Sequence, residues 1–184
     1  MKKSRIILLC CIFTTFLFAC EKEKNEPKKN PDPVAKHYIE YDGKKYEVTN
    51  IMISKKLDPL SAKYRIFTIH ITSPSVTYGQ YSRDLTGTGN GIRAIIWGKS
   101  NDVVIPTGTY TDSGDSEIKY YDMSHCELMF DYDFYFSSSL NTISISKATL
   151  TIKKKGDKEE FIFSGKDSNG KSINCTIVET PFYF

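Results

Sequence analysis

The amino-acid sequence predicts an all-β domain over residues 37–184. It would be either an antiparallel β-sandwich or a small closed barrel, lipocalin-like as one option, of about nine strands. Runs rich in Ile, Val, Thr, Tyr and Phe alternate with clusters of Gly, Pro, Asn, Asp and Ser. Two dipeptides that favour type I′ hairpin turns, Asp42-Gly43 and Asn169-Gly170, lie between such runs. No stretch of the domain shows a sustained helical period, which excludes a large helical layer.

The expected strands follow one another at short intervals, as in an antiparallel domain. Lys155-Gly156-Asp157 supplies a third chain reversal, so the last three strands are predicted to form an antiparallel meander. The expected strands are His37–Tyr41, Lys45–Ile53, Tyr64–Thr72, Gly91–Trp97, Val103–Thr111, Cys126–Phe136, Thr142–Lys154, Glu160–Ser164 and Ser172–Glu179.

The strand from Cys126 to Phe136 has a regular alternation. Its even-numbered positions are all apolar or aromatic, whereas Asp131 and Asp133 fall between them. Because successive side chains of a strand point to opposite faces, this pattern predicts one buried face and one solvated face.

The strand from Thr142 to Lys154 changes phase along its length. Ile145 is in phase with Ile143, but Ala148 and the apolar residues after it are in the opposite phase. A regular strand cannot place both sets in the core. The sequence therefore predicts a bulge or a bend near Ser146-Lys147.

The first twenty residues have the zones of an export signal. Lys2, Lys3 and Arg5 precede an uncharged, mostly apolar run, Ile6 to Ala19, that is too short to span a bilayer as a helix. Leu17-Phe18-Ala19-Cys20, at the end of this run, resembles the lipobox of bacterial lipoproteins. This resemblance implies that residues 1–19 are a signal peptide and that Cys20 carries the lipid that anchors the chain to a membrane.

Residues 20–36 are predicted to be a lipidated cysteine followed by a disordered tether. The segment is rich in Lys, Glu and Pro, and it contains too few apolar residues to offset the entropy cost of ordering. Leader, tether and small all-β domain together resemble the envelope lipoproteins of Bacteroidetes. The resemblance implies a cell-envelope location at the outer membrane, and both the periplasmic face and the cell surface are compatible with it.

The charge balance argues against nucleic acid as a partner. The chain has 25 Lys and Arg against 22 Asp and Glu, and three of the basic residues belong to the leader. Without the leader, no positive surplus remains to displace counterions from phosphates.

Two cysteines, Cys126 and Cys175, lie in the expected domain, each within an alternating run that points it inward. In an oxidising compartment they form either a disulfide or two buried thiols, and the sequence is compatible with both. The three histidines lack the spacing of metal ligands, and no metal or other cofactor is predicted. His70 shares a strand face with Thr68 and Thr72, so we expect it to be exposed.

Recognisable catalytic motifs do not occur. The sequence contains no G-x-S-x-G nucleophile motif, and the glycines of Gly87–Gly91 lack the spacing of a phosphate-binding loop. Asp84, Asp115 and Glu117 are expected to be solvated turn residues rather than a glycosidase pair or a calcium site.

Four tyrosines are the candidate ligand-binding residues. Tyr78, Tyr81, Tyr120 and Tyr121 fall in the long connecting segments of the expected domain. Tyrosine offers an apolar face with a polar tip, which suits stacking on sugar rings or on a partner protein. The alternative is that these rings fold back over the ends of the sheet.

The sequence therefore favours a non-catalytic binding module, anchored by lipid, for a glycan, a small ligand or an envelope protein. The alternative is a structural or assembly subunit of a surface complex that pairs through an exposed strand edge. A hydrolase is the third hypothesis, and no motif supports it.

Overall fold

The structure, a computed structural model, describes residues 36–112, 119–134 and 141–184. The chain divides after Val34, and Ala35–Phe184 form one compact unit with a hydrophobic core of its own. The described residues form 13 strands and no helix, so none of their segments is a helix that could cross a bilayer. The strands are β1 His37–Tyr41, β2 Lys44–Val48, β3 Asn50–Leu57, β4 Tyr64–Thr72, β5 Thr77–Gly79, β6 Asp84–Thr86, β7 Thr88–Lys99, β8 Gly108–Thr111, β9 Met123–Asp133, β10 Thr142–Lys155, β11 Lys158–Lys166, β12 Ser172–Glu179 and β13 Phe182–Tyr183.

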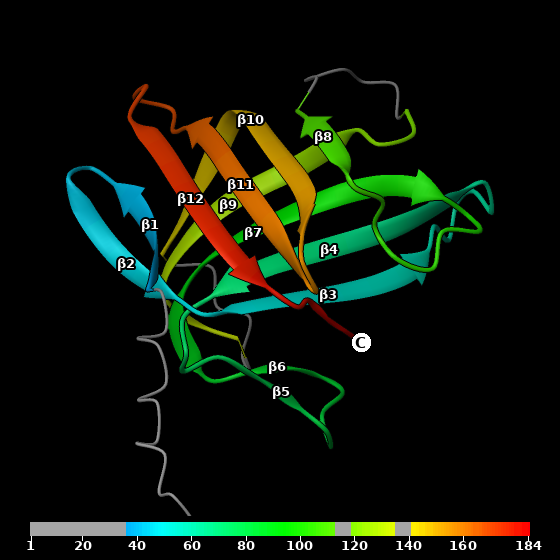
Figure 1. The fold of residues 1–184 in the computed structure, drawn as a ribbon, viewed down its shortest axis with the longest axis horizontal. Helices are drawn as coiled ribbons and strands as arrows, with labels where there is room; N and C mark the ends of the chain where they lie inside the picture. The colour runs from blue at the N-terminus through cyan, green and yellow to red at the C-terminus, as the bar shows by residue number, and fades with distance from the viewer. Residues whose placement is uncertain (1–35, 113–118, 135–140) are drawn as a thin grey trace, which may run out of the picture. The chain divides into compact units, whose positions relative to one another are not determined.

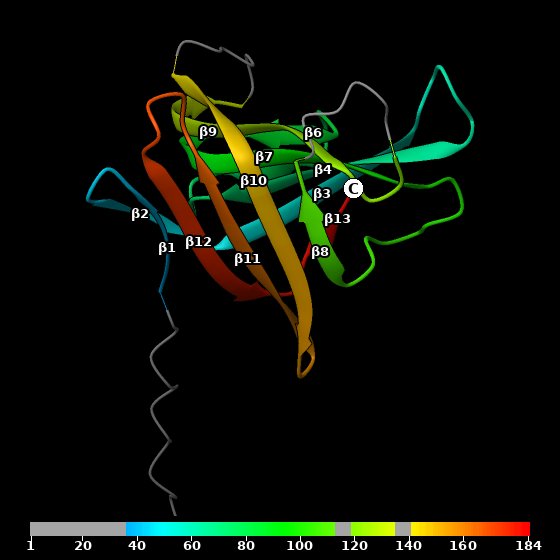
Figure 2. The same cartoon turned by 90° about the horizontal axis from the view of Figure 1, so that it is seen from above.

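One large sheet contains all but two of these strands. Its order is β13-β3-β4-β7-β9-β10-β11-β12-β1-β2, and β8 pairs with β10 outside this path. The sheet curls into a half-barrel (Figures 1 and 2), while β5 and β6 form a separate two-stranded sheet. The all-β class is confirmed. The pairings are antiparallel except for β13 on β3 and one isolated bridge among the described residues.

The main core lies between the two halves of the curled sheet. Apolar side chains from β3, β4, β7 and β9 pack with those of β10, β11, β12 and β1, and Phe67, Phe161 and Phe163 are the largest fully buried ones. A second, smaller core lies apart from it and includes Val76, Leu85 and residues of β3 and β9. This second core attaches the β5–β6 hairpin to the large sheet.

The predicted bend in the expected Thr142–Lys154 strand is confirmed. The pairing between β10 and β11 shifts register between Ser146 and Thr149, and Lys147 has a left-handed φ of 51°. β10 pairs with β9 up to Ile145, with β11 from Ser146 onward, and with β8 after the bulge, from Thr149 to Ile152. The bulge buries both Ile145 and Ala148, and it joins the two halves of the sheet.

The single-phase pattern expected for Cys126–Phe136 is wrong. Cys126 and Leu128 point into the main core, but Met129, Tyr132 and Phe134 belong to the second core. Asp131 has a left-handed φ of 43°, and its backbone N–H donates to the Asn90 side chain at 3.1 Å. The resulting bulge switches the phase of the strand, and Phe136 lies outside the described residues.

Two expected strands differ from the structure. Lys45–Ile53 is divided into β2 and β3 at Thr49, whose N–H donates to the Thr72 carbonyl at 2.9 Å. Of the expected strand Val103–Thr111, only β8 forms. The chain at Val103 and Val104 is irregular, and both side chains are exposed. The split of one strand and the short β5, β6 and β13 account for the difference from the nine expected strands.

The hairpin turns are partly as predicted. Asp42 and Gly43 have φ values of 49° and 72°, as a type I′ turn requires. At Asn169-Gly170 only Gly170 is left-handed, and its N–H donates to the Asp167 carbonyl. This is a three-residue loop with a glycine bulge, so the type I′ prediction is wrong there, although the last three strands form the predicted meander.

Candidate functional site

A groove of about 440 Å³ lies beside the first residues of β3. Three parts of the chain form its walls: the beginning of β3 with Thr49 before it, the segment through β5, and the segment from the end of β12 to the start of β13. Its volume is in the range typical of small-molecule sites. The lining residues are Thr49, Asn50, Ile51, Met52, Val76, Thr77, Tyr78, Gln80, Glu179, Thr180 and Phe182.

Three aromatic rings form an apolar cluster at the groove. The ring of Tyr78 lies 5.3 Å from that of Phe182 and 4.8 Å from that of Phe184, measured between centroids. Phe182 is 50% exposed, whereas Tyr78 and Phe184 are half-buried. Pairing of β13 with β3 fixes the two phenylalanines, and the Phe184 N–H donates to the Ile53 carbonyl at 3.0 Å.

Hydrogen bonds and close backbone packing hold the Ser73–Val76 segment beside the groove. The Asn50 side-chain amide donates to the carbonyls of Ser73 and Val76 at 3.2 and 2.9 Å. A Cβ on Gly87, which has a φ of +100°, would lie 2.3 Å from the Ser75 carbonyl oxygen. The glycines of Gly87–Gly91 therefore have a packing role at the start of β7.

The polar groups of the groove lie around this aromatic cluster. Gln80 and Thr180 are exposed, and Glu179 is half-buried. The Lys158 ammonium donates to both Glu179 carboxylate oxygens, at 3.2 and 3.1 Å. The described lining thus combines an apolar ring surface with amide, hydroxyl and carboxylate groups, which is the composition of a site for a ligand with both apolar and hydroxyl surfaces.

The four tyrosines predicted to bind ligand are separated by the structure. Tyr78 lines the groove, and Tyr81, in the turn between β5 and β6, is fully exposed outside the lining. Tyr120 packs against Tyr64 with centroids 5.0 Å apart. The Tyr121 hydroxyl donates to Asp102 at 3.4 Å, so the last two tyrosines lie in a different cluster from Tyr78.

Cys126 and Cys175 are free, buried thiols, so the disulfide alternative does not apply to this structure. Their strands, β9 and β12, are separated in the sheet by β10 and β11. Burial is the main reason that the pKa of each thiol is raised to about 12. Both cysteines act as small hydrophobic residues of the main core.

The exposed position expected for His70 is wrong. Its Nδ1 atom is buried without a hydrogen-bond partner among the described residues, and its ring lies 6.1 Å from that of Phe134. His70 as a whole is half-buried, and Thr72, on the same face, is fully buried. Burial and the nearby positive charge of Arg93, which pairs with Glu127, lower the pKa of His70 from 6.5 to about 4. The second core, which the sequence pattern did not reveal, covers this face.

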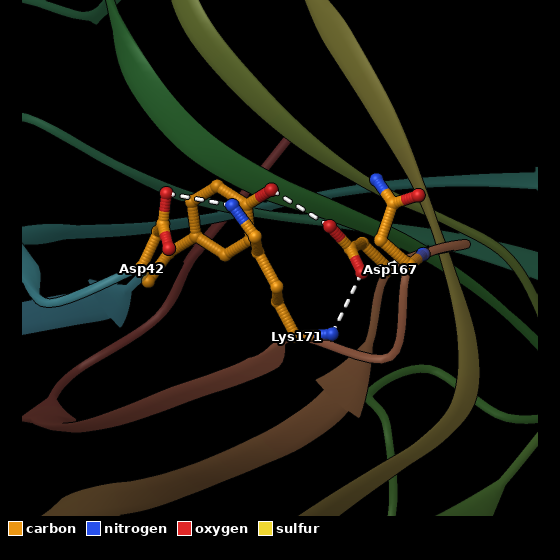
Figure 3. Close-up of polar contacts among 5 residues, drawn as sticks. Asp42, Asp167 and Lys171 are labelled. Carbon is orange, nitrogen blue, oxygen red and sulfur yellow. Dashed lines mark hydrogen bonds and ion pairs between the residues drawn. The ribbon is translucent and has the colours of Figure 1, made fainter.

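A polar network at another part of the sheet holds two turns together (Figure 3). The Lys171 ammonium donates to Asp42 at 2.8 Å, which links the β11–β12 turn to the β1–β2 turn. The Lys171 backbone N–H donates to Asp167 at 2.8 Å. Because these groups satisfy one another, we assign the network a structural role.

Comparisons with protein-family models, curated proteins and solved structures found no match.

The groove includes residues that the sequence analysis missed. Only Tyr78 was predicted, since Phe182 and Glu179 of the lining, and Phe184 behind them in the aromatic cluster, are distant from it in the chain. The aromatic run Phe182-Tyr183-Phe184 is the one sequence signal that could have indicated this cluster. Cys20, Asp115 and Glu117 lie outside the described residues.

Proposed function

We propose that this chain is a lipid-anchored, non-catalytic binding module of the bacterial cell envelope, and that its groove takes a glycan or another small ligand. The proposal of location rests on Leu17-Phe18-Ala19-Cys20 and on the basic and apolar residues that precede it. The proposal of binding rests on the groove beside β3 with its partly exposed aromatic rings.

The chemistry of the groove favours a sugar or a similar ligand. Pyranose rings present C–H groups on one face and hydroxyls at the edge. Phe182 and Tyr78 offer aromatic surface for the C–H face, and Gln80 and Glu179 offer hydrogen-bonding groups for the hydroxyls. A volume of about 440 Å³ suits a ligand of one or two sugar rings better than a protein surface.

Binding without catalysis is supported by the acidic groups of the groove. Glycoside hydrolysis ordinarily uses two carboxyl groups on either side of the scissile bond. Glu179 is the one carboxylate among the described lining residues, and Lys158 already pairs with it.

The alternative function, a subunit that assembles through an exposed strand edge, is not supported by β2, which is the last strand at one edge of the sheet. β2 is only five residues long and carries Lys44, Lys45 and Glu47. Short edges with charged side chains discourage the addition of a strand from another protein.

A glycan array probed with residues 35–184 tests the binding proposal. We expect signals that are lost in Phe182→Ala and in Gln80→Ala, both of which alter exposed groove residues. Tyr81→Ala is the matched control, because Tyr81 is exposed on the same hairpin outside the lining. Absence of signal, or equal loss in the control, would contradict the proposal.

Metabolic labelling with radioactive palmitate tests the anchor separately. The wild-type chain should be labelled and found in the membrane fraction, whereas Cys20→Ser should be unlabelled. Equal labelling of both chains would refute lipidation at Cys20 and leave the groove proposal unaffected.

A further inference from the structure

Two connecting loops meet at one end of the half-barrel and expose aliphatic side chains there. We call this surface the loop-tip patch; it consists of Leu57 at the end of β3, the β3–β4 loop and the β7–β8 loop (Figures 1 and 2). Four of its side chains are at least half exposed, and Leu60, at 95%, is almost completely so. They are Leu57, Leu60, Val103 and Val104.

Hydrogen bonds join the two loops into one surface. The Ser100 N–H donates to the Lys63 carbonyl at 3.1 Å, and the Arg65 guanidinium donates to the Ser100 carbonyl at 2.8 and 3.1 Å. The Lys55 ammonium donates to the Val103 carbonyl at 3.1 Å. The aliphatic side chains are therefore held outward by an ordered framework.

Hydrogen bonds of Asp58 also hold the turn of the β3–β4 loop, in which the Leu60 side chain is exposed to solvent. The Asp58 carboxylate accepts a hydrogen bond from the Leu60 N–H at 3.0 Å, and the Asp58 N–H donates to the Tyr64 carbonyl at 3.1 Å. One exposed leucine is ordinary, but here Leu60 belongs to a group of four exposed aliphatic side chains, and such a group is typical of a surface that contacts a partner or a membrane.

The charges around the patch are mostly positive. Residues 55–65 and 97–106 contain five Lys and Arg against two Asp. Both aspartates are engaged locally: Asp58 holds the turn at Leu60, and Asp102 accepts from the Lys99 N–H at 2.7 Å. The surplus of positive charge complements an anionic surface.

Aromatic side chains lie at the same end of the sheet. Trp97 and Tyr120 both pack against Tyr64, with centroids 6.1 and 5.0 Å from its ring, and Tyr120 is 45% exposed. Tyr and Trp are the residues that favour the boundary between lipid headgroups and hydrocarbon.

We propose that the loop-tip patch inserts into the interface of an anionic lipid membrane, with the aliphatic tips among the acyl chains and the lysines among the headgroups. A protruding aliphatic tip with a basic rim fits a lipid surface, which deforms around it. A protein partner would more commonly use a flat or concave patch with a buried aromatic anchor. This proposal does not depend on the groove, or on lipidation at Cys20.

Flotation of residues 35–184 with phospholipid vesicles tests the proposal, because this unit lacks Cys20 and the leader. Vesicles of one part phosphatidylglycerol to three parts phosphatidylcholine should bind the protein, and pure phosphatidylcholine should bind it more weakly. Leu60→Asp should weaken binding by about tenfold or more, and Lys63→Glu by about fivefold or more. Binding should also weaken as the salt concentration rises.

Two matched variants serve as controls. Tyr81→Asp places a charge at another fully exposed position, and Lys153→Glu reverses an exposed charge on β10. Both should bind vesicles like the wild type. No binding to anionic vesicles at about 1 mM lipid, or equal losses in the patch and control variants, would overturn the proposal. So would a concentration-dependent dimer abolished by Leu60→Asp, since the patch would then bind a second copy.

Discussion

The Tyr41 hydroxyl donates a hydrogen bond of 2.8 Å to Asp167, although these residues lie 126 positions apart in the chain. Asp167 is only 3% exposed and also accepts from the backbone N–H groups of Asn169 and Lys171. Burial alone would raise the pKa of Asp167, but these hydrogen bonds outweigh it and hold the pKa below its ordinary value. The contact fastens β1 to the β11–β12 turn.

Removal of this phenolic hydroxyl should destabilise the fold. Tyr41→Phe leaves Asp167 with one partner fewer, and we expect the thermal midpoint to fall by about 3–6 °C. Differential scanning calorimetry at pH 7 measures the change. Tyr38→Phe, also on β1, should have a smaller effect. An unchanged midpoint in Tyr41→Phe would show that the bond contributes little.

His70 should make the fold sensitive to moderate acid. Its folded-state pKa of about 4 lies below the ordinary value of 6.5, so the unfolded chain takes up a proton first as the pH falls. The stability that depends on neutral His70 is fully present above pH 6.5 and is lost as the pH falls toward 4. The loss is about 3 kcal/mol at most, since one pKa unit corresponds to about 1.4 kcal/mol.

Urea unfolding at pH 7 and pH 4.5 measures this loss. His70→Phe should lose clearly less stability between the two values than the wild type, because it has no proton to take up at this position. His37→Phe, at the start of β1, is the control and should behave like the wild type. Identical acid losses in all three proteins would exclude His70 as the source.

The β10 bulge should respond to the backbone preference of the residue at position 147. Lys147 has a left-handed φ of 51°, which glycine adopts readily and β-branched residues strongly disfavour. We expect Lys147→Gly to change stability by less than about 1 kcal/mol and Lys147→Val to destabilise by about 1–2 kcal/mol. Urea denaturation compares them.

Lys153, exposed on the same strand outside the bulge, supplies the matched control. Lys153→Val should be neutral or slightly stabilising, because β-branched residues suit regular strands. If Lys147→Val and Lys153→Val had the same stability, position 147 would not be left-handed.

The two domain cysteines should behave as protected thiols. Cys126 and Cys175 are buried, and the raised pKa of each leaves very little thiolate at neutral pH. Ellman's reagent should react with two thiols of residues 35–184 in denaturant, but only slowly in the native protein. A reductant should leave the thermal midpoint unchanged. A mass two hydrogens lower than the reduced protein would instead reveal a disulfide.

Several features of the fold could be predicted from the sequence because they depend on local patterns. The change of phase between Ile145 and Ala148 predicted the β10 bulge, and Asp42-Gly43 predicted a type I′ turn. The phase switch in β9 could not be predicted in this way. It depends on a contact between Asp131 and Asn90, which are 41 positions apart.

The candidate site was less predictable than the fold. Tyr78 could be singled out because tyrosine in a connecting segment is an accessible recognition residue. Phe182 and Phe184 reach it only through the parallel pairing of β13 with β3, a long-range contact without a local signal. The same limit applies to His70, because the second core that covers its strand face also depends on long-range contacts.

The groove itself is tested most directly by chemical-shift mapping. Labelled residues 35–184 would be titrated with a glycan that scores on the array, and amide shifts would be followed by heteronuclear NMR. We predict that the largest shifts occur in Val76–Gln80 and Glu179–Phe182, two segments that supply lining residues of the groove. Shifts confined to other strands would contradict the assignment of the groove as the binding site.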